Sequence, residues 1–249
     1  MKVGFAPHAT NWKNGYFWEI VMNLKLFVAL LAFTSLAILG VSACATEPEV
    51  ESVVEDTPVE APGALASSSG EPTGSHTSAE WQVWAYSNAA PSFIGENATI
   101  LDADSNVLRE GTNGWTCLAA NPRGMSDPEN GWNDAHEAMP LCGDEEGFKW
   151  IGAYLTGETP QLERDTYVWM LHGDKGEDNS TPFVRNQVDA EDPANWIESG
   201  PHLMLMPKDP ASLDNFTTDF TTGSPYAMFR GTKYTHLMIP TEGYFDYRR

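Results

Sequence analysis

The sequence has 249 residues, with 14 Lys or Arg against 35 Asp or Glu, and a formal net charge of −21. Proteins that bind nucleic acid present a basic surface to the phosphates, and so do proteins that dock on anionic lipid by charge. The acidic balance therefore argues against both kinds of partner. We attribute most of it to solubility, because recruitment of cations needs a specific site.

An apolar segment from Leu26 to Cys44 indicates the compartment in which the chain works. Lys25 precedes the segment and small residues lead to the cysteine, as in a cleavable secretory signal peptide. The segment is shorter than the roughly 20 apolar residues that span a bilayer, so we favour a signal over a membrane anchor. Met22 is a suitable start for this signal, and we expect residues 1–21 to be an upstream extension rather than a cytoplasmic segment.

The end of this segment, Val41 to Cys44, resembles the bacterial lipobox. The resemblance implies that residues 22–43 are a lipoprotein signal peptide and that Cys44 carries a lipid and begins the mature chain. Residue 45 is Ala rather than the aspartate of an inner-membrane retention signal. We therefore expect an exported lipoprotein of the cell envelope, anchored through its lipid to the outer membrane in preference to the inner one.

Residues 44–78 are rich in Glu, Pro, Ser, Gly and Ala. Such a composition does not bury enough apolar surface to become ordered. No Lys or Arg occurs between Lys25 and Arg109, so the acidic charges repel one another and extend the chain. We predict a disordered tether here and a globular domain over residues 79–249.

The chain has three cysteines. If Cys44 carries lipid, Cys117 and Cys142 remain in an oxidising compartment, and we predict a disulfide between them. Closing a loop of about 26 residues contributes roughly 3 kcal/mol in the chain-entropy model. The competing interpretation, a metal site with two cysteines, lacks a second close ligand beside either one.

The first elements of the domain are predicted to be a helix and a hairpin. Ser78 is a suitable N-cap for a helix over residues 79–86, and residues 98–101 and 107–110 flank a polar turn. That turn, Asp102 to Asn106, has the D-x-D-x-N spacing that opens an EF-hand loop. It lacks the glycine and the glutamate that such a loop needs, so we interpret it as a turn and not as a calcium site.

A long polar loop and a second helix follow. Residues 121–143 are rich in Asp, Asn, Gly and Pro, and long ordered loops often carry function. Residues 144–155 begin with acidic residues, which favour a helix N-terminus, and Gly157 follows their end. We expect this helix to face the core with Phe148, Ile151 and Leu155.

Four further strands are predicted at residues 167–172, 202–206, 226–229 and 235–239, with a long polar loop over residues 173–199. Three of these strands are apolar on both faces, which is typical of central strands. The mixture predicts a single α+β domain with a mixed, mostly antiparallel sheet, two or three short helices and one disulfide.

Four segments resemble a family of secreted bacterial proteins whose activity is uncharacterised. They are LREGTNGWTC at 108–117, MPLC at 139–142, GPHLM at 200–204 and YTHLMIP at 234–240. The resemblance covers roughly residues 81–240, nearly the whole domain. It implies no activity and no functional residues.

Three of the predicted strands combine His with Met on one face, because side chains alternate along a strand. Thioethers with imidazoles are ligands for copper, particularly Cu(I). The sequence thus offers a copper site made of Met170, His172, His202, Met204, Met206, His236 and Met238. The alternative is a structural core, because Met is a common core residue and the sequence does not fix strand order. If the His–Met faces form a metal site, the core lies on the opposite faces of the same strands, which include Tyr167, Leu203 and Leu237.

An enzyme is the alternative from another functional class. The candidates for acid or base are His136 with Glu137, His202, His236, Asp134 and Asp144, and we predict that His136 is a solvated residue of its loop. No nucleophile elbow, zinc-protease motif or phosphate loop occurs. We therefore expect a module that binds a ligand or partner, with copper as one candidate, and a hydrolase or isomerase using His136 or His202 as the alternative.

Overall fold

The computed structural model describes residues 70–247. The expected upstream extension, the signal peptide, Cys44 and residues 45–69 of the expected tether lie outside the described residues. Within residues 70–247, no helix has both the length and the apolar character needed to cross a membrane. Residues 70–78, which we expected in the tether, contact the domain, because Trp81 donates a hydrogen bond to Glu71 and its ring stacks on His76.

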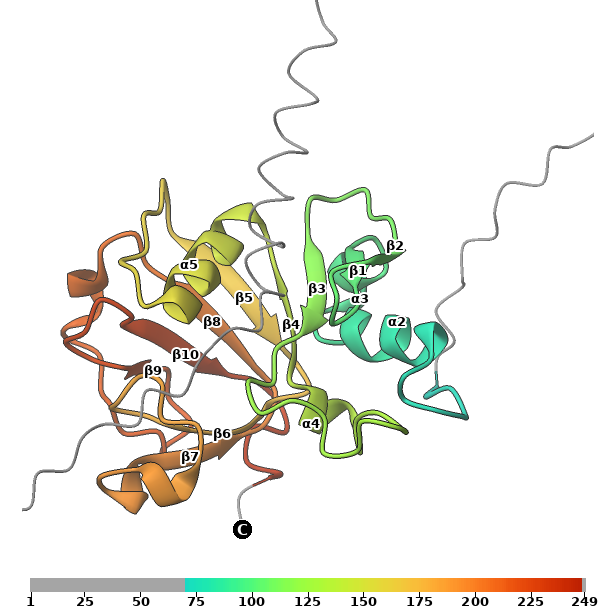
Figure 1. Cartoon of the computed structure of the whole chain (residues 1–249). Helices are drawn as coiled ribbons and strands as arrows, with labels where there is room; N and C mark the ends of the chain where they lie inside the picture. The colour runs from blue at the N-terminus through green and yellow to red at the C-terminus, as the bar shows by residue number, and fades with distance from the viewer. Residues whose placement is uncertain (1–69, 248–249) are drawn as a thin grey trace, which may run out of the picture. The chain divides into compact units, whose positions relative to one another are not determined.

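The described domain combines helices with short strands (Figure 1). Its helical segments are α2 (Ala79–Ser87), α3 (Ser92–Gly95), α4 (Ala135–Ala138), α5 (Glu145–Thr156), η1 (Gln187–Asp189), η2 (Pro193–Asn195) and η3 (Pro210–Leu213). Its strands are β1 (Thr99–Leu101), β2 (Val107–Arg109), β3 (Thr116–Ala119), β4 (Pro140–Gly143), β5 (Thr166–Met170), β6 (Asp174–Asp178), β7 (Trp196–Ser199), β8 (His202–Met206), β9 (Tyr226–Met228) and β10 (His236–Pro240). The predicted α+β class is confirmed.

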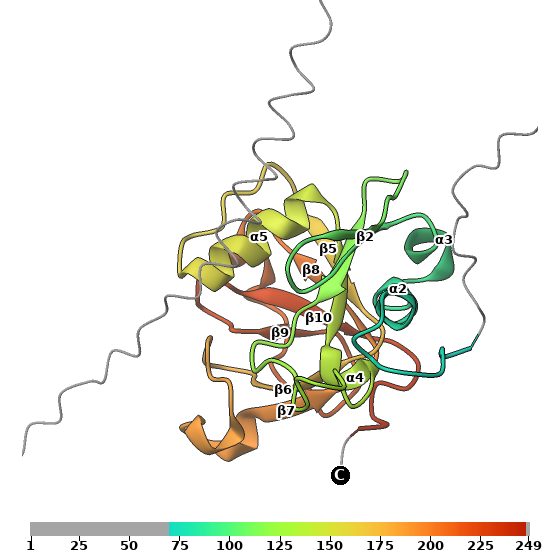
Figure 2. The same ribbon diagram turned by 45° about the vertical axis from the view of Figure 1, so that its right-hand side comes forward.

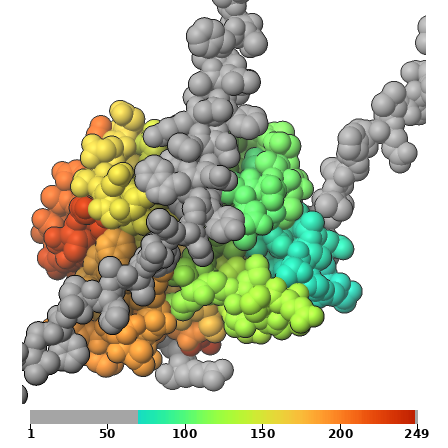
Figure 3. All heavy atoms as spheres, in the orientation of Figure 1, coloured from blue at the N-terminus to red at the C-terminus, as the bar shows by residue number. Residues whose placement is uncertain are grey.

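Eight of these strands form one mixed sheet in the order β2-β1-β3-β4-β5-β8-β10-β9, and β6 pairs with β7 in a second sheet. Within the large sheet β1 and β3 are parallel, and the other neighbouring pairs are antiparallel. In Figure 3 the early part of the described chain, in green, and the late part, in orange and red, lie on opposite sides of the domain. The predicted mixed, mostly antiparallel sheet is confirmed.

Helices α2 and α5 cover opposite faces of the sheet (Figure 2). Cys142 and Gly143 are neighbours on β4, so they face opposite sides. The Cys142 sulfur lies 3.5 Å from the Tyr86 carbonyl oxygen of α2, whereas a side chain at Gly143 would meet Phe148 of α5. The domain accordingly has two hydrophobic cores, one beneath each helix.

Cys117 and Cys142 are direct register partners on β3 and β4, and they form a disulfide. Both cysteines are fully buried beneath α2. The predicted pairing is confirmed, and it leaves neither sulfur free to bind a metal.

The predicted helix starts are confirmed by their caps. The Ser78 hydroxyl accepts a hydrogen bond from the backbone of α2 at 3.2 Å, and the Asp144 carboxylate accepts one from Gly147 of α5 at 2.9 Å. These bonds satisfy N–H groups that have no partner within the helix. Both helices therefore begin where local sequence places them.

The predicted core face of α5 is partly wrong. Leu155 is 42% exposed, whereas Trp150 is buried in the core. Gly147 lies against Val168 of β5, and its lack of a side chain lets that side of the helix approach the sheet. This contact rotates the buried face from Leu155 toward Trp150.

Two segments that we predicted as long loops contain strands. Residues 173–199 hold β6 and β7, and residues 121–143 end in β4. β6 consists of Asp, Lys, Gly, Glu and Asp, so no apolar alternation marks it as a strand. Its strand conformation follows from pairing with β7, which local sequence does not reveal.

Candidate functional site

The three predicted His–Met strands adjoin, since β5, β8 and β10 are neighbours in the sheet. Met170 pairs with His202, and Met204 pairs with Met238. Paired residues share a face, and alternation adds the others on each strand. One face therefore carries six of the seven predicted copper ligands, namely Met170, His202, Met204, Met206, His236 and Met238.

This His–Met face is also the larger hydrophobic core. Its methionines are buried together with Trp150 and Val168. The opposite face, on which we placed the core, is partly open, and Tyr167 is 46% exposed there. The prediction of a core on that face is therefore only partly right, since Leu237 is buried there. Each strand is apolar on both faces, so the sequence does not show which face is covered. In the structure α5 and β7 cover the His–Met side.

His202 and His236 do not form one site. In the β8–β10 register His202 pairs with Pro240, so His236 lies four residues farther along β10. At about 3.4 Å per residue the two positions are roughly 14 Å apart along the strands. Their Nδ1 atoms lie 2.8 Å from the Gly200 carbonyl and 3.0 Å from the Tyr234 carbonyl. Burial lowers the pKa of both imidazoles to about 4, so both rings are neutral.

His172 is separated from the other predicted ligands. It follows the end of β5 in a turn, and its ring lies 5.9 Å from that of Trp84 on α2. Burial, with a smaller contribution from His136, lowers the pKa of His172 to about 4. Its Nε2 is buried and has no hydrogen-bond partner among the described residues. His172 therefore belongs to the α2 side of the sheet and not to the His–Met face.

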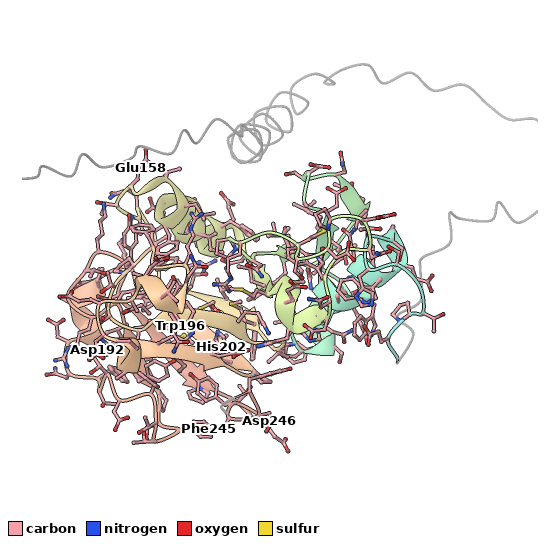
Figure 4. All side chains as sticks on the ribbon, turned by 60° about the horizontal axis from the view of Figure 1, so that its bottom comes forward. Glu158, Asp192, Trp196, His202, Phe245 and Asp246 are labelled. Atoms are coloured by element: carbon pink, nitrogen blue, oxygen red, sulfur yellow. A yellow bond between two sulfur atoms is a disulfide. The ribbon has the colours of Figure 1, made fainter. Side chains whose placement is uncertain are left out.

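An open pocket lies beside α4, between β6, β7 and the end of the described chain. Its volume is ≈ 350 Å³, and it is lined by Asp134, His136, Lys175, Glu198, Asp246 and Tyr247. We call it the His136 pocket. Figure 4 shows Asp246 at the rim of the domain and His202 among the strands. The sequence-derived enzyme candidates are thus separated, since His136 reaches a pocket and His202 is enclosed.

Three contacts fix the His136 ring. Its Nδ1 lies 2.6 Å from the His172 carbonyl oxygen, and its Nε2 lies 3.1 Å from Glu198 Oε1. One face of the ring stacks on Tyr247, with centroids 3.6 Å apart. His136 is only 4% exposed, so the prediction of a solvated loop residue is wrong. The partners that bury it come from distant parts of the chain.

The charges of the His136 pocket are unevenly satisfied. Lys175 and His136 both contact Glu198 Oε1, at 3.4 and 3.1 Å. Asp134 caps α4 through one carboxylate oxygen, and neither Asp134 nor Asp246 has an ion pair within the described part of the chain. Burial raises the pKa of Tyr247, and the carboxylates of Asp134, Asp246 and Glu198 add to the rise. Three acids therefore surround the tyrosine at the pocket wall.

A second polar cluster adjoins this pocket along β6, and sequence reasoning missed it. Tyr154 of α5 donates a hydrogen bond of 2.5 Å to Glu177. Burial raises the pKa of Glu177 to about 8, and repulsion from Asp174 adds to the shift. The pKa of Asp174 is raised by burial too, against the attraction of Arg123. Two acidic residues three apart are a weak sequence signal, because most such pairs are solvated.

Backbone strain gathers around this cluster. Met139, Phe183 and Phe229 have positive φ angles of 48°, 69° and 53°. Large side chains rarely adopt this conformation, which costs about 1–3 kcal/mol and is enriched at functional sites. Phe183 and Phe229 stack on Tyr154, and Met139 contacts Arg123. The strain thus surrounds the aromatic and acidic groups between α5 and β6.

The remaining candidates have structural roles. Asp144 caps α5, and Glu137 accepts hydrogen bonds from the backbone of Ser126 and Asn133. Within residues 70–247 no group of three or more His, Cys, Asp or Glu side chains is placed to hold a metal ion.

Asp102 of the EF-hand-like turn uses both carboxylate oxygens within the turn, accepting from Asp104 and Asn106. The interpretation as a turn therefore agrees with its contacts.

Comparison with known proteins adds no relative. No family model matches the chain. No curated protein and no solved structure matches it either.

Proposed function

We propose that the chain is an exported lipoprotein whose domain binds a small organic cation, such as an amine, in the His136 pocket. The observation that carries the proposal is the charge balance there. Lys175 and His136 are both engaged with Glu198, whereas Asp134 and Asp246 have no cationic partner among the described residues. An amine would supply that partner.

The size and setting of the pocket support this ligand class. A volume of ≈ 350 Å³ falls at the lower end of small-molecule sites, which span about 300–1,000 Å³. The net charge of −21 raises the concentration of cations around the chain. The ring of Tyr247 gives the pocket an apolar wall for the carbon skeleton of an amine.

The same contacts weigh against the enzymatic alternative. A general base needs a ring nitrogen that is free to take a proton from the substrate. An oxygen atom lies within 3.1 Å of each nitrogen of His136, so both are occupied. His202 is enclosed in the core with its Nδ1 on the Gly200 carbonyl. Binding is therefore the better supported class.

Calorimetric titration of the full chain with 1,5-diaminopentane, 1-aminopentane and 1-pentanol tests the ligand class. We expect both amines to bind, the alcohol to give no signal, and affinity to fall with added salt. Equal binding of amine and alcohol, or no binding of either amine, would overturn the proposal.

Charge-neutralising variants locate the site. Asp246→Asn should weaken amine binding roughly tenfold, the equivalent of about 1.4 kcal/mol. Asp134→Asn should act in the same direction while keeping the helix cap, since Asn caps as well as Asp. Asp104→Asn, in the exposed turn of the hairpin, is the matched control and should bind as the parent does. Identical affinities for all three variants would place the ligand elsewhere.

Lipid anchoring rests on the signal-like segment and on Cys44, and it has its own test. In a bacterial host grown with labelled palmitate, the chain should take up label and sediment with membranes. Cys44→Ser should abolish the label and the processing. Unchanged labelling of that variant would refute the anchor without affecting the pocket.

A further inference from the structure

His236 lies between two methionines on the neighbouring strands. On β9 it pairs directly with Met228. On β8 Leu205 pairs with Leu237 of β10, so the antiparallel register places Met206 beside His236 at the next position. Directly opposed residues have Cβ atoms about 4.5–5.5 Å apart, within reach of a long thioether side chain. The sheet thus presents a thioether on each side of one imidazole.

The hydrogen bonding of the ring prepares it for a metal. Its Nδ1 lies 3.0 Å from the Tyr234 carbonyl oxygen, which accepts only from an N–H. The proton of the neutral ring is therefore on Nδ1, and Nε2 keeps its lone pair. Metal-binding histidines commonly donate their other ring N–H to a backbone carbonyl in this way.

The surroundings of the ring are apolar and held by a strained turn. Trp150 and Phe229 meet it edge to face, with centroids 5.2 and 5.4 Å away. Phe229, which follows Met228, has a φ of 53°, and its carbonyl accepts a hydrogen bond of 2.9 Å from Thr235. This turn fixes the position of Met228 relative to His236.

We propose that Met206, His236 and Met228 form a three-ligand site for Cu(I). Soft thioethers with one imidazole select Cu(I), whereas zinc and calcium require nitrogen, thiolate or oxygen ligands. All three side chains are at least 96% buried, so the metal is shielded from water and oxidants. The site goes beyond the amine pocket and does not depend on it. It includes Met228, which sequence reasoning missed, and excludes Met170, His172 and His202.

The test uses the full chain with Cys44→Ser, so that no free thiol competes for copper. Cu(I) is supplied as its coloured bicinchoninate complex with ascorbate, both to the folded protein and during refolding, because the site is enclosed. We expect the chain to withdraw one Cu(I) and X-ray absorption at the copper edge to show two sulfur ligands and one nitrogen. If the chain withdraws no copper either when folded or during refolding, the proposal is overturned.

Conservative variants separate this site from the other methionines. Met206→Leu and Met228→Leu keep volume, cost less than about 1.5 kcal/mol of stability and remove one ligand each. Each should weaken Cu(I) binding at least tenfold. Met170→Leu, which alters the methionine beside His202, is the matched control and should bind as the parent does. Parental binding by Met206→Leu and Met228→Leu, or a loss confined to Met170→Leu, would refute the assignment.

Discussion

The His136 pocket and the core around His236 each bury a histidine, but the surroundings are charged in the first and apolar in the second. His136 is 4% exposed and His236 is 3% exposed, so burial does not distinguish them. Their partners do. An oxygen lies at each nitrogen of His136 and a charged pocket opens beside it, whereas His236 has one carbonyl partner and aromatic rings around it. The chemistry available to a buried histidine is set by the groups at its second nitrogen.

Replacing each of the two histidines by alanine should give the largest difference in stability between the two regions. His236→Ala leaves a cavity beside Trp150, and we expect the free energy of unfolding to fall by about 3 kcal/mol. His136→Ala opens toward a pocket where water can solvate the freed His172 carbonyl, so the loss should be about 1 kcal/mol. Urea denaturation measures both. Equal losses in the free energy of unfolding would mean that water does not reach the His172 carbonyl when the His136 side chain is removed.

Glu177, between the two regions, should make stability depend on pH. Its pKa is raised to about 8 from 4.5, so between these values the folded chain holds a proton that the unfolded chain releases. Its contribution to stability is therefore fully present below pH 4.5 and is lost as the pH rises to about 8. Asp174, whose pKa is also raised, acts in the same direction.

Thermal melts between pH 5 and pH 9 test this dependence. Glu177→Gln should flatten the profile and raise the melting temperature at pH 9 by about 5 °C relative to the parent. Some slope should remain because Asp174 is intact. Glu110→Gln, an exposed residue after β2, serves as control. A parental slope in Glu177→Gln would show that the carboxyl group is solvated.

Lys175→Ala should have the smallest effect on stability. Lys175 and Glu198 are 40% and 36% exposed, and such pairs contribute about 0–1 kcal/mol. Removing the cation makes the net charge of the His136 pocket more negative, so amine affinity should rise about threefold. A change of that size corresponds to the free energy of a weak surface ion pair. Calorimetry with 1,5-diaminopentane measures this change. Weaker binding would instead make Lys175 a contact to an anionic part of the ligand.

Local signals were enough to predict much of the fold. Alternation predicts the bounds of β8, and a cysteine count predicts the disulfide. The N-cap Ser78 and the acidic first turn of the second helix predict the starts of α2 and α5 to within one residue. The strand and the helix starts depend on residues that are adjacent in the sequence. The disulfide follows because only two cysteines remain to pair. β6 was missed because its strand conformation depends on a partner that begins eighteen positions after its end, at Trp196.

The candidate sites were harder to predict because they depend on register and on distant partners. The His–Met strands were identified, but only the strand order shows that His236 has a methionine on each side and that His202 lies apart from it. The burial of His136 depends on the His172 carbonyl and Glu198, 36 and 62 residues farther along the chain. No pattern near His136 records those contacts.

The wall formed by Asp246 and Tyr247 gives the His136 pocket an unusual dependence on the far end of the described chain. Tyr244 is buried and its hydroxyl lies 2.6 Å from that of Tyr226, whereas residues 245–247 are exposed. Cleavage of the chain after Tyr244 would remove one side of the pocket and leave every described strand in place. The fold and the His136 pocket can thus be uncoupled by shortening the chain, without any substitution.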